Sequence, residues 1–275
     1  MNTSQELVIE AGKTESLYWR DLFRYRELFY FLAWRDVLVR YKQTVIGVLW
    51  AVLRPFLTMA VFVLVFGKIA KLPSDGIPYP VMVFAAMLPW QLFATALSEG
   101  SNSLITNANL ISKIYFPRLI VPASAVIVSF VDFAISLALL AILLIYYQVW
   151  PTWHILALPC FTLLTLVAST GAGLWLSALN VQYRDFRYVV PFIVQFGLYL
   201  SPVGFSSSVI PEKWRLLYSL NPMVGVIDGF RWAISGGRSP LYLPGVWASL
   251  AVTALLLAVG IWYFRRMERT FADVI

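Results

Sequence analysis

The chain has 275 residues, of which 60% are hydrophobic and only 13% are charged, and its formal net charge is +7. A soluble globular domain carries about 25% charged residues, so this composition indicates a membrane protein and argues against an ordinary soluble enzyme. A single cysteine, Cys160, excludes an intrachain disulfide, and a single histidine, His154, excludes a metal site built from several histidines. In a membrane protein, the placement of positive charges indicates which segments face the cytoplasm, and a net positive charge need not indicate nucleic-acid binding. We expect no nucleic-acid partner.

The first 44 residues contain no long apolar run, so we expect no cleavable secretory signal there. Residues 17–35, LYWRDLFRYRELFYFLAWR, carry Arg20, Arg24 and Glu27 on one helical face and apolar side chains toward another. This pattern predicts an amphipathic helix on the inner membrane surface, which acts as a lipid anchor, as a docking surface for a cytoplasmic partner, or as both. Residues 1–44 then form a cytoplasmic arm, and its candidate interface residues are Trp19, Arg20, Arg24 and Glu27.

Residues 11–14, AGKT, resemble the end of a phosphate-binding Walker A loop. That motif requires a glycine five residues before Gly12, and the residue at that position is Leu7. No strand pattern precedes it either. We therefore expect the chain itself to bind no nucleotide by such a loop, so that any energy from ATP must come through a partner.

Six apolar runs follow, each near the ~20 residues that cross a bilayer as a helix. They cover residues 45–66, 79–97, 119–145, 155–179, 188–205 and 243–264. Six spans leave both ends of residues 45–275 on the same side of the membrane. If that side is cytoplasmic, the inner segments carry more than twice as many Lys and Arg residues as the outer segments, in agreement with the positive-inside rule. The sequence therefore predicts an all-α polytopic membrane protein with cytoplasmic termini.

The segment NLISKIYFPRLIVP, residues 109–122, lies between the second and third runs and holds no group suited to acid–base or metal chemistry. It combines large apolar side chains with two cations, and Pro117 favours a break before the next span. We interpret it as a cytoplasmic docking loop whose apolar groups a partner buries and whose cations orient the contact. A positively charged topology determinant alone is the alternative. The candidate docking residues are Ile111, Lys113, Ile114, Tyr115, Phe116, Pro117 and Arg118.

Asp132, near the middle of the third run, is the one obvious acid within the spans. A carboxylate inside a membrane is costly, which makes it a candidate functional residue. The alternative is that Asp132 faces the bundle interior, where it bonds a Ser, Tyr or Arg or stays protonated. Because a proton relay usually needs several such groups, we favour the structural alternative. No acid pair, histidine cluster or nucleophile beside a base is evident, so we expect neither a catalytic nor a metal-binding residue.

Residues 206–240, between the fifth and sixth runs, carry signals for two short helices. Asn221 and Pro222 match an N-cap followed by proline at the first helical position, and the glycine pair that begins at Gly236 is a typical helix end. A helix between these signals is too short to cross the membrane. With a second short helix over residues 211–219, the segment predicts an outer re-entrant hairpin buried against the bundle. A loop lying in the headgroups is the alternative.

Two charged residues of this segment, Asp228 and Arg231, stand three positions apart on the predicted helix and are candidates for an ion pair. The candidate residues of the outer segment are Asn221, Pro222, Asp228 and Arg231.

Four stretches of the chain, taken together, resemble a known family. They are RYKQTVIGVLWAVLRPF at 40–56, NLISKIYFPR at 109–118, VQYRDFRYVVPF at 181–192 and LNPMVGVIDGFRWAI at 220–234. At these spacings in a six-span chain, they resemble the membrane subunit of ABC-2 type polysaccharide exporters, the permeases for O-antigen, capsule and teichoic acid. The resemblance covers nearly the whole chain.

The resemblance implies a homodimer of six-span subunits in the bacterial inner membrane, joined to two separate ATP-binding cassette subunits that bind ATP and Mg²⁺. It implies a lipid-linked glycan as substrate, and it makes the loop between the second and third spans a coupling helix that rests in a groove of the ATPase. The chain would then be a transport subunit without an ATPase site of its own. The alternatives are an ABC-2 exporter of lipid or drug, a membrane enzyme acting on lipid-linked sugars, and an ion-coupled transporter or channel.

Overall fold

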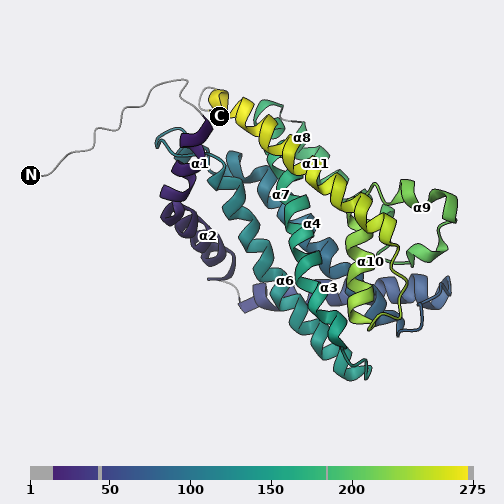
Figure 1. Cartoon of the computed structure of the whole chain (residues 1–275). Coiled ribbons are helices and arrows are strands. Elements are labelled where there is room, and N and C mark those ends of the chain that lie inside the picture. Colours follow the sequence, from purple (N-terminus) through teal and green to yellow (C-terminus); the bar gives the residue numbers. More distant parts are fainter. Residues whose placement is uncertain (1–14, 43–44, 184, 272–275) are drawn as a thin grey trace, which may run out of the picture.

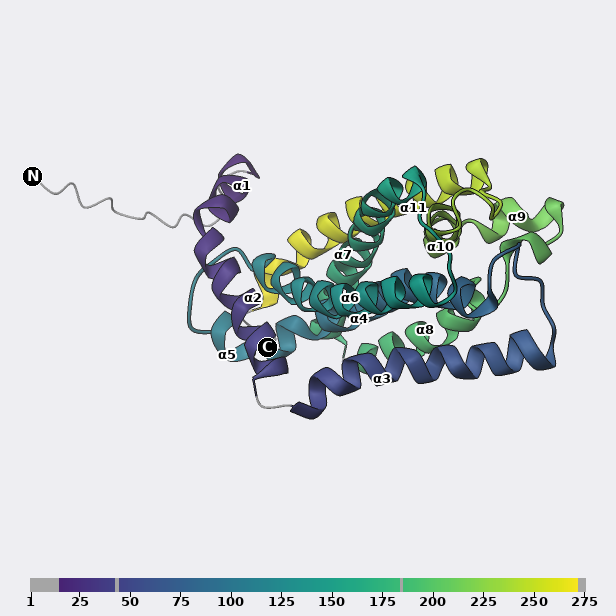
Figure 2. The ribbon, with the colours of Figure 1, turned by 90° about the horizontal axis from the view of Figure 1, so that it is seen from below.

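The computed structural model describes residues 15–42, 45–183 and 185–271, and all regular structure in this part of the chain is helical. Most of the helices pack along one another as a bundle, with the N-terminal helices α1 and α2 at one side and the short helix α9 at the opposite side (Figure 1 and, from below, Figure 2). The AGKT segment at residues 11–14 and the side chain of Trp19 lie outside the described part.

The predicted N-terminal amphipathic helix forms as two helices, α1 (Glu15–Arg24) and α2 (Arg26–Tyr41). They meet at Tyr25, whose ψ of 22° departs from helical geometry. Part of the apolar surface of the pair packs against the protein's own interior, with Leu32 buried at 2% exposure. Other large apolar side chains of the pair remain exposed, namely Phe23, Tyr30, Phe31 and Trp34. The two helices therefore contact the bundle on one side and present apolar groups to their surroundings on another.

Among the described residues, five helices are long and apolar enough to cross a membrane. They are α3 (Val45–Phe62, continued by the π-helical turns η1, Val63–Ile69), α4 (Tyr79–Thr106), α6 (Ile120–Tyr146), α7 (Leu158–Gln182, preceded by the 3-10 turn η2, Trp153–Ala157) and α11 (Leu243–Met267, followed by the 3-10 turn η4, Glu268–Thr270). They coincide with five of the six predicted runs. The chain is therefore a polytopic helical membrane protein.

The remaining predicted run forms a shorter helix, α8 (Phe186–Leu200), of 15 residues. At ~1.5 Å per residue it is about 22 Å long, less than the ~30 Å of a bilayer core. It ends before the predicted residue 205 because Pro202 disfavours a helical conformation at the preceding residue. Ser201 is accordingly extended, with ψ at 153°.

The bundle is held together by close approaches between helix backbones. α4 is its central helix and is buried over most of its length, against α6 on one side and α7 on the other. Gly260 of α11 meets Gly171 of α7 so closely that a Cβ at Gly260 would lie 2.1 Å from the carbonyl oxygen of Gly171. Such small residues allow close helix packing in a membrane, where there is no hydrophobic force between helices.

Two short helices lie between α8 and α11, as predicted: α9 (Glu212–Tyr218) and α10 (Pro222–Ile234). Asn221 caps α10, because its side-chain oxygen accepts a hydrogen bond of 3.0 Å from the amide of Met223. Gly236, with φ at +68°, follows the helix in a left-handed conformation that suits glycine. Every residue of α10 except Pro222 and Trp232 is buried.

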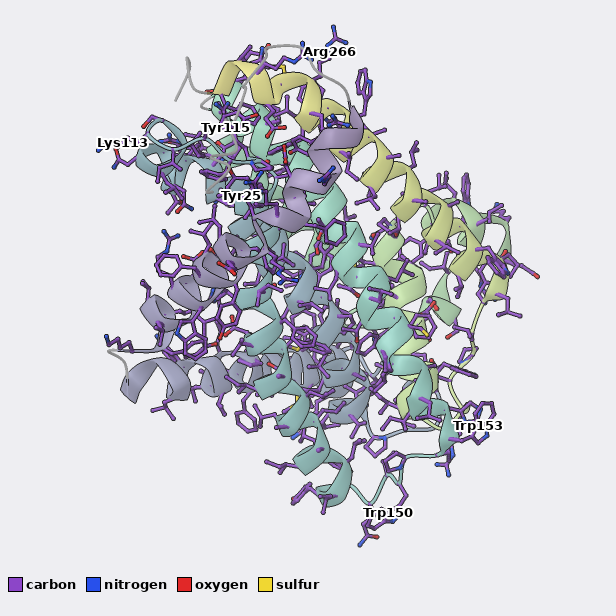
Figure 3. All side chains as sticks on the ribbon, turned by 60° about the vertical axis from the view of Figure 1, so that its left-hand side comes forward. Tyr25, Lys113, Tyr115, Trp150, Trp153 and Arg266 are labelled. Atoms are coloured by element: carbon purple, nitrogen blue, oxygen red, sulfur yellow. The ribbon has the colours of Figure 1, made fainter. Side chains whose placement is uncertain are left out.

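The bundle has two distinct ends (Figure 3). Trp150 and Trp153 lie at one of them, which we call the tryptophan end; the α9–α10 hairpin lies here too, since the ring of Trp232 packs edge-on against His154 of η2. Lys113, Tyr115 and Arg266 lie at the other, which we call the loop end. The first and last described segments are both at the loop end (Figure 1).

Candidate functional site

The predicted docking loop divides into an exposed tip and an anchored part. It begins within the single turn α5 (Ala108–Ile111) and ends in the first turn of α6. Lys113, Ile114 and Tyr115 are exposed, Tyr115 by 64%, and form the loop tip. Phe116 and Ile111 are each only 3% exposed. The prediction that Ile111 and Phe116 are free to be buried by a partner is therefore wrong in this structure, because the chain's own core already buries them.

A small hydrophobic core at the loop end receives these anchored residues; we call it the loop-end cluster. Its members come from α2, the loop, the turn after α11 and four long helices, α4, α6, α7 and α11: Leu32, Leu104, Ile111, Phe116, Leu119, Ile120, Val121, Leu174, Ala178, Phe264 and Phe271. Pro117 is buried beside them. The cluster therefore joins segments that are far apart in the sequence into one packed unit beneath the exposed tip.

Arg118, predicted to orient a partner, instead binds the C-terminal turn of its own chain. Its backbone amide donates a hydrogen bond of 2.7 Å to Oε1 of Glu268. Its guanidinium donates to the carbonyl oxygen of Glu268 and lies over the ring of Phe271. Arg118 thus holds the anchored part of the loop to the end of α11.

Tyr18 of α1 joins the same contact. Its hydroxyl donates a 3.1 Å hydrogen bond to Oε1 of Glu268. Burial, with the Glu268 carboxylate adding to it, raises the pKa of Tyr18, so the hydroxyl keeps its proton as a donor. The guanidinium of Arg265 stacks over the Tyr18 ring, 4.6 Å from its centroid.

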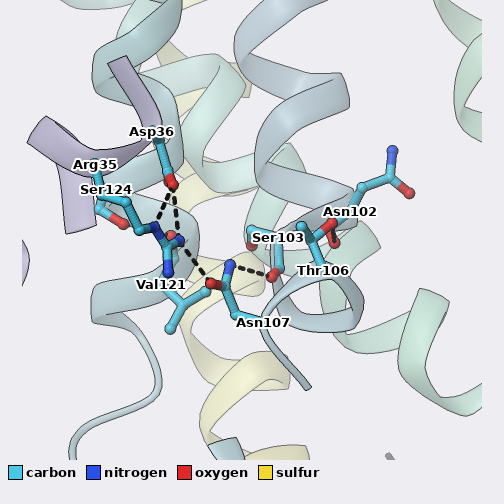
Figure 4. Close-up of polar contacts among 8 residues, drawn as sticks. All are labelled: Arg35, Asp36, Asn102, Ser103, Thr106, Asn107, Val121 and Ser124. Atoms are coloured by element: carbon cyan, nitrogen blue, oxygen red, sulfur yellow. Dashed lines mark hydrogen bonds and ion pairs between the residues drawn. The ribbon is translucent and has the colours of Figure 1, made fainter. Parts of the chain in front are cut away.

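A second contact ties α2 to the start of the loop (Figure 4). Arg35 donates hydrogen bonds to the carboxylate of Asp36, at 2.7 Å, and to the side-chain oxygen of Asn107, also at 2.7 Å. The amide nitrogen of Asn107 donates in turn to the carbonyl oxygen of Ser103 at 2.9 Å. Arg35 thereby fixes the end of α4, where the loop begins.

The charged face of the N-terminal helices points away from the cluster. Arg20, Arg24 and Glu27 are all exposed, in agreement with the predicted amphipathic pattern. These residues and the loop tip both lie at the loop end, on surfaces that remain open to a partner.

Asp132 bonds a tyrosine and an arginine, as the structural alternative predicted. The hydroxyl of Tyr41 donates to Oδ1 of Asp132, and Arg40 pairs with Oδ2 at 2.8 Å. Arg40 also pairs with Glu99 of α4 at 3.0 Å. These contacts tie the C-terminal end of α2 to both α4 and α6, and they satisfy the charge of Asp132.

At the tryptophan end, the candidate ion pair between Asp228 and Arg231 does not form. The structure describes both residues, and neither is an ion-pair or hydrogen-bond partner of the other. Arg231 is fully buried and donates to three carbonyl oxygens, of Phe205 at 2.8 Å, Val203 at 3.0 Å and Met82 at 3.3 Å. Two of these carbonyls belong to the non-helical segment after α8, which offers acceptors that no helix satisfies.

Asp228 is also buried, at 6% exposure, and lines a small cavity together with Ser207, Arg215 and Tyr218. Arg231 thus fixes α10 to α4 and to the segment after α8. Sequence spacing alone could not show that the acceptors for Arg231 would be backbone groups.

Within residues 15–42, 45–183 and 185–271, no three His, Cys, Asp or Glu side chains gather in a way that could hold a metal ion. Sequence analysis also overlooked two residues of the loop end, Tyr18 and Glu268. A signal for Glu268 existed, because it is the lone acid in the basic run RRMER after the last span. Its partners in the loop and in α1 were visible only in the fold.

These features define a polytopic helical membrane protein whose exposed basic and aromatic loop tip is anchored in a small core at one end of the bundle. Residues 27–235 match the ABC-2 type transporter family, and the chain belongs to this family.

Curated relatives extend the match over nearly the whole chain. The O-antigen export system permease protein RfbA of Myxococcus xanthus is 31% identical over 259 residues, which cover 93% of this chain and 98% of the relative. The O-antigen export system permease protein RfbA of Klebsiella pneumoniae is 27% identical, with 88% and 92% covered. The polysialic acid transport protein KpsM of Escherichia coli is 22% identical, with 85% and 91% covered.

Proposed function

We propose that this chain is the permease subunit of an ATP-driven exporter that moves a lipid-linked polysaccharide across the bacterial inner membrane. Membership of the ABC-2 family supports an export role. Three relatives, each aligned with at least 85% of this chain, are named for the export of O-antigen or the transport of polysialic acid, and they support the substrate class. The single observation that carries the mechanism is the division of the loop into an exposed tip and a part anchored in the bundle.

The loop tip docks a separate ATP-binding cassette subunit, which binds ATP and Mg²⁺ and performs hydrolysis. Ile114 and Tyr115 offer apolar area for burial in the partner, and Lys113 lies beside them at the edge of the contact. Because Phe116 is packed in the loop-end cluster, a push on the tip is carried into the bundle instead of being absorbed by a loose loop. The exposed Arg20, Arg24 and Glu27 offer a second contact surface for the same partner or for lipid headgroups.

The loop end faces the cytoplasm, and the chain crosses the membrane six times, α8 being the fifth span. The excess of Lys and Arg in the segments assigned to this side supports the orientation. A tilted or thinned bilayer accommodates a helix as short as α8. With six spans, both ends of the chain lie on the cytoplasmic side and the α9–α10 hairpin lies in the outer half of the membrane as a re-entrant element.

The active assembly is a homodimer with two ATPase subunits. α8 buries only Val190 within its own chain. It exposes an aromatic stripe at helical spacing, formed by Tyr188, Phe192, Phe196 and Tyr199. A short helix that is poorly covered gains from association with another protein surface, and a second copy of the chain supplies that surface. Aromatic faces next to such an interface also suit the apolar faces of sugar rings.

The docking role is tested by isolating the tagged chain from its host and measuring how much ATPase subunit accompanies it. Full burial of a large apolar side chain contributes roughly 1.5–3 kcal/mol, so the double change Ile114→Ala and Tyr115→Ala should reduce the accompanying ATPase at least about tenfold. Lys113→Ala should have little effect, because a charge at the rim of a contact contributes about 0–1 kcal/mol.

The matched control is the double change Trp150→Ala and Trp153→Ala, which removes exposed aromatic area at the tryptophan end. It should leave the ATPase bound. An undiminished amount of ATPase with the loop-tip variant would show that the tip is not the docking element and would point to the exposed face of α1 and α2.

A further inference from the structure

Three segments that are distant in the sequence meet at one side chain, Glu268. Its Oε1 atom accepts from the hydroxyl of Tyr18 in α1 and from the amide of Arg118 in the loop. Its carbonyl oxygen accepts from the guanidinium of Arg118. Glu268 itself is the first residue after α11. The loop, the N-terminal helix and the last long helix are thus joined through one residue.

The loop reaches α11 through non-covalent contacts, which are the packing of the loop-end cluster against Phe264 and the hydrogen bonds of Glu268. The loop continues covalently into α6, so a push on its tip reaches α6 directly, but no covalent connection leads from it to α11. Arg118 and Tyr18 contact the end of α11 through Glu268, Arg265 and Phe271. Of these, Glu268 holds both the loop and α1 by hydrogen bonds.

α11 in turn reaches the α9–α10 hairpin at the tryptophan end. The hydroxyl of Ser249 in α11 accepts a 3.1 Å hydrogen bond from the amide of Gly225 in α10. It also donates at 3.4 Å to the carbonyl oxygen of Ser219, at the end of α9. With 25 residues, α11 is about 37 Å long. One rigid helix therefore contacts the loop at one end and the hairpin at the other.

We propose that Glu268 is a positioning residue that makes α11 move together with the loop, so that a push from the ATPase reaches the α9–α10 hairpin through α11 as well as through α6. This proposal rests on the proposed function, because it assumes that the loop tip is where the ATPase pushes. It goes beyond that function by assigning the transmission to a residue outside the loop and to a helix that the loop does not continue into.

The first test measures glycan moved per ATP hydrolysed by the purified permease–ATPase complex in vesicles, with lipid-linked glycan extracted from cells that lack this chain. Glu268→Ala should lower this ratio about threefold to tenfold while the ATPase stays bound, because the loop tip is untouched. Glu268→Gln, which keeps Oε1 as an acceptor, should stay within about twofold of the wild type. Tyr18→Phe, which removes one hydroxyl, should have a smaller effect in the same direction as Glu268→Ala.

The double variant Tyr18→Phe and Glu268→Ala should be no worse than Glu268→Ala alone, since both changes break one contact and such effects are not additive. Thr270→Ala in the same turn and Tyr25→Phe in the same cluster are the matched controls and should leave the ratio unchanged. A wild-type ratio in Glu268→Ala would overturn the proposal. If Glu268→Ala is not recovered as folded protein, a wild-type ratio in Tyr18→Phe overturns it.

Hydrogen exchange of the permease alone separates this proposal from the proposed function. Residues 112–119 and α1 should exchange faster in Glu268→Ala than in the wild type, in the absence of ATPase and glycan. Unchanged hydrogen exchange in both segments would contradict the proposal that Glu268 holds the loop and α1 to the end of α11, even if export is normal. A wild-type complex that moves no glycan would contradict the proposed function. The hydrogen-exchange result would then test the role of Glu268 by itself.

Discussion

Single residues in this bundle show how polar groups are accommodated in an apolar environment. Asp132, Arg40 and Tyr41 satisfy one another, and Arg231 is satisfied by backbone carbonyls instead of a carboxylate. In each case the structure supplies partners for a group whose burial would otherwise be costly. This supports a structural role for Asp132, since its carboxylate is fully engaged with α2.

Replacement of Asp132 tests that role. Asp132→Asn keeps an acceptor for Tyr41 but removes the charge that Arg40 pairs with, and we expect it to lower the free energy of unfolding by about 1 kcal/mol. Asp132→Ala removes both contacts and should cost about 2 kcal/mol. Thermal unfolding of the purified protein measures both. Glu99→Gln, which perturbs only the more exposed partner of Arg40, should change stability by less than about 1 kcal/mol.

Export provides the decisive comparison for the same variant. A structural Asp132 implies that Asp132→Asn still exports glycan in proportion to the folded protein that remains. Normal folding and normal ATPase binding with a complete loss of export would instead assign Asp132 a direct part in transport.

At the scale of helices, glycines determine which pairs approach closely. A Cβ at Gly260 would lie 2.1 Å from the carbonyl oxygen of Gly171, a backbone atom that cannot rotate away. A Cβ at Gly100 would lie 3.9 Å from its nearest neighbours, Gly173 and Val126, which is ordinary contact. At Gly260, the α7–α11 crossing therefore has no room for a Cβ atom. At Gly100, the α4–α7 crossing has room for a methyl group.

These two glycines form a matched pair for mutation. Gly260→Ala forces α7 and α11 apart and should destabilise the protein by about 1–3 kcal/mol or more. Gly100→Ala adds a methyl group without a clash in a helix, where alanine is preferred by about 1 kcal/mol, so it should be neutral or stabilising. Thermal unfolding of the two variants side by side gives the answer. Equal melting temperatures would mean that the α7–α11 crossing is looser than the structure indicates.

Sequence patterns predicted helices more reliably than contacts. The apolar runs, the caps at Asn221 and Gly236, and the alternation of faces over residues 17–35 are local signals, and the helices they predict are present. The end of α8 was predicted too late because a long apolar run outweighed the effect of Pro202. Local signals of this kind determine where a helix forms but not which of its neighbours it contacts.

The candidate site was predicted only in part for that reason. The exposed loop tip, Lys113 to Tyr115, agrees with a docking role, but Phe116 and Arg118 are held within the chain. Residue type alone does not distinguish a docking residue from an anchor, because large aromatic residues and Arg also occur at protein interfaces. Their partners, Phe271 and Glu268, lie about 150 residues away in the sequence, a separation at which periodicity and capping carry no information.

The orientation of the whole molecule in the membrane can be measured with single cysteines in a background where Cys160 is replaced. Trp150 and Lys113 are both exposed and lie at opposite ends, whereas Ser239 is buried and would be a poor reporter. Trp150→Cys should react with a membrane-impermeant maleimide in spheroplasts. Lys113→Cys should react only after the membrane is opened. The reverse labelling pattern would show that the loop end faces outward and would contradict the proposed topology.

The central claim is that this chain moves a lipid-linked polysaccharide with energy from ATP hydrolysed by its partner. It is tested most directly in inside-out inner-membrane vesicles from cells with the chain deleted, restored, or restored with the Ile114→Ala and Tyr115→Ala double change. The fraction of glycan protected from an added glycosidase reports transport into the lumen. We predict ATP-dependent protection only with the restored wild-type chain. Protection without the chain, or protection that is independent of ATP, would contradict the account.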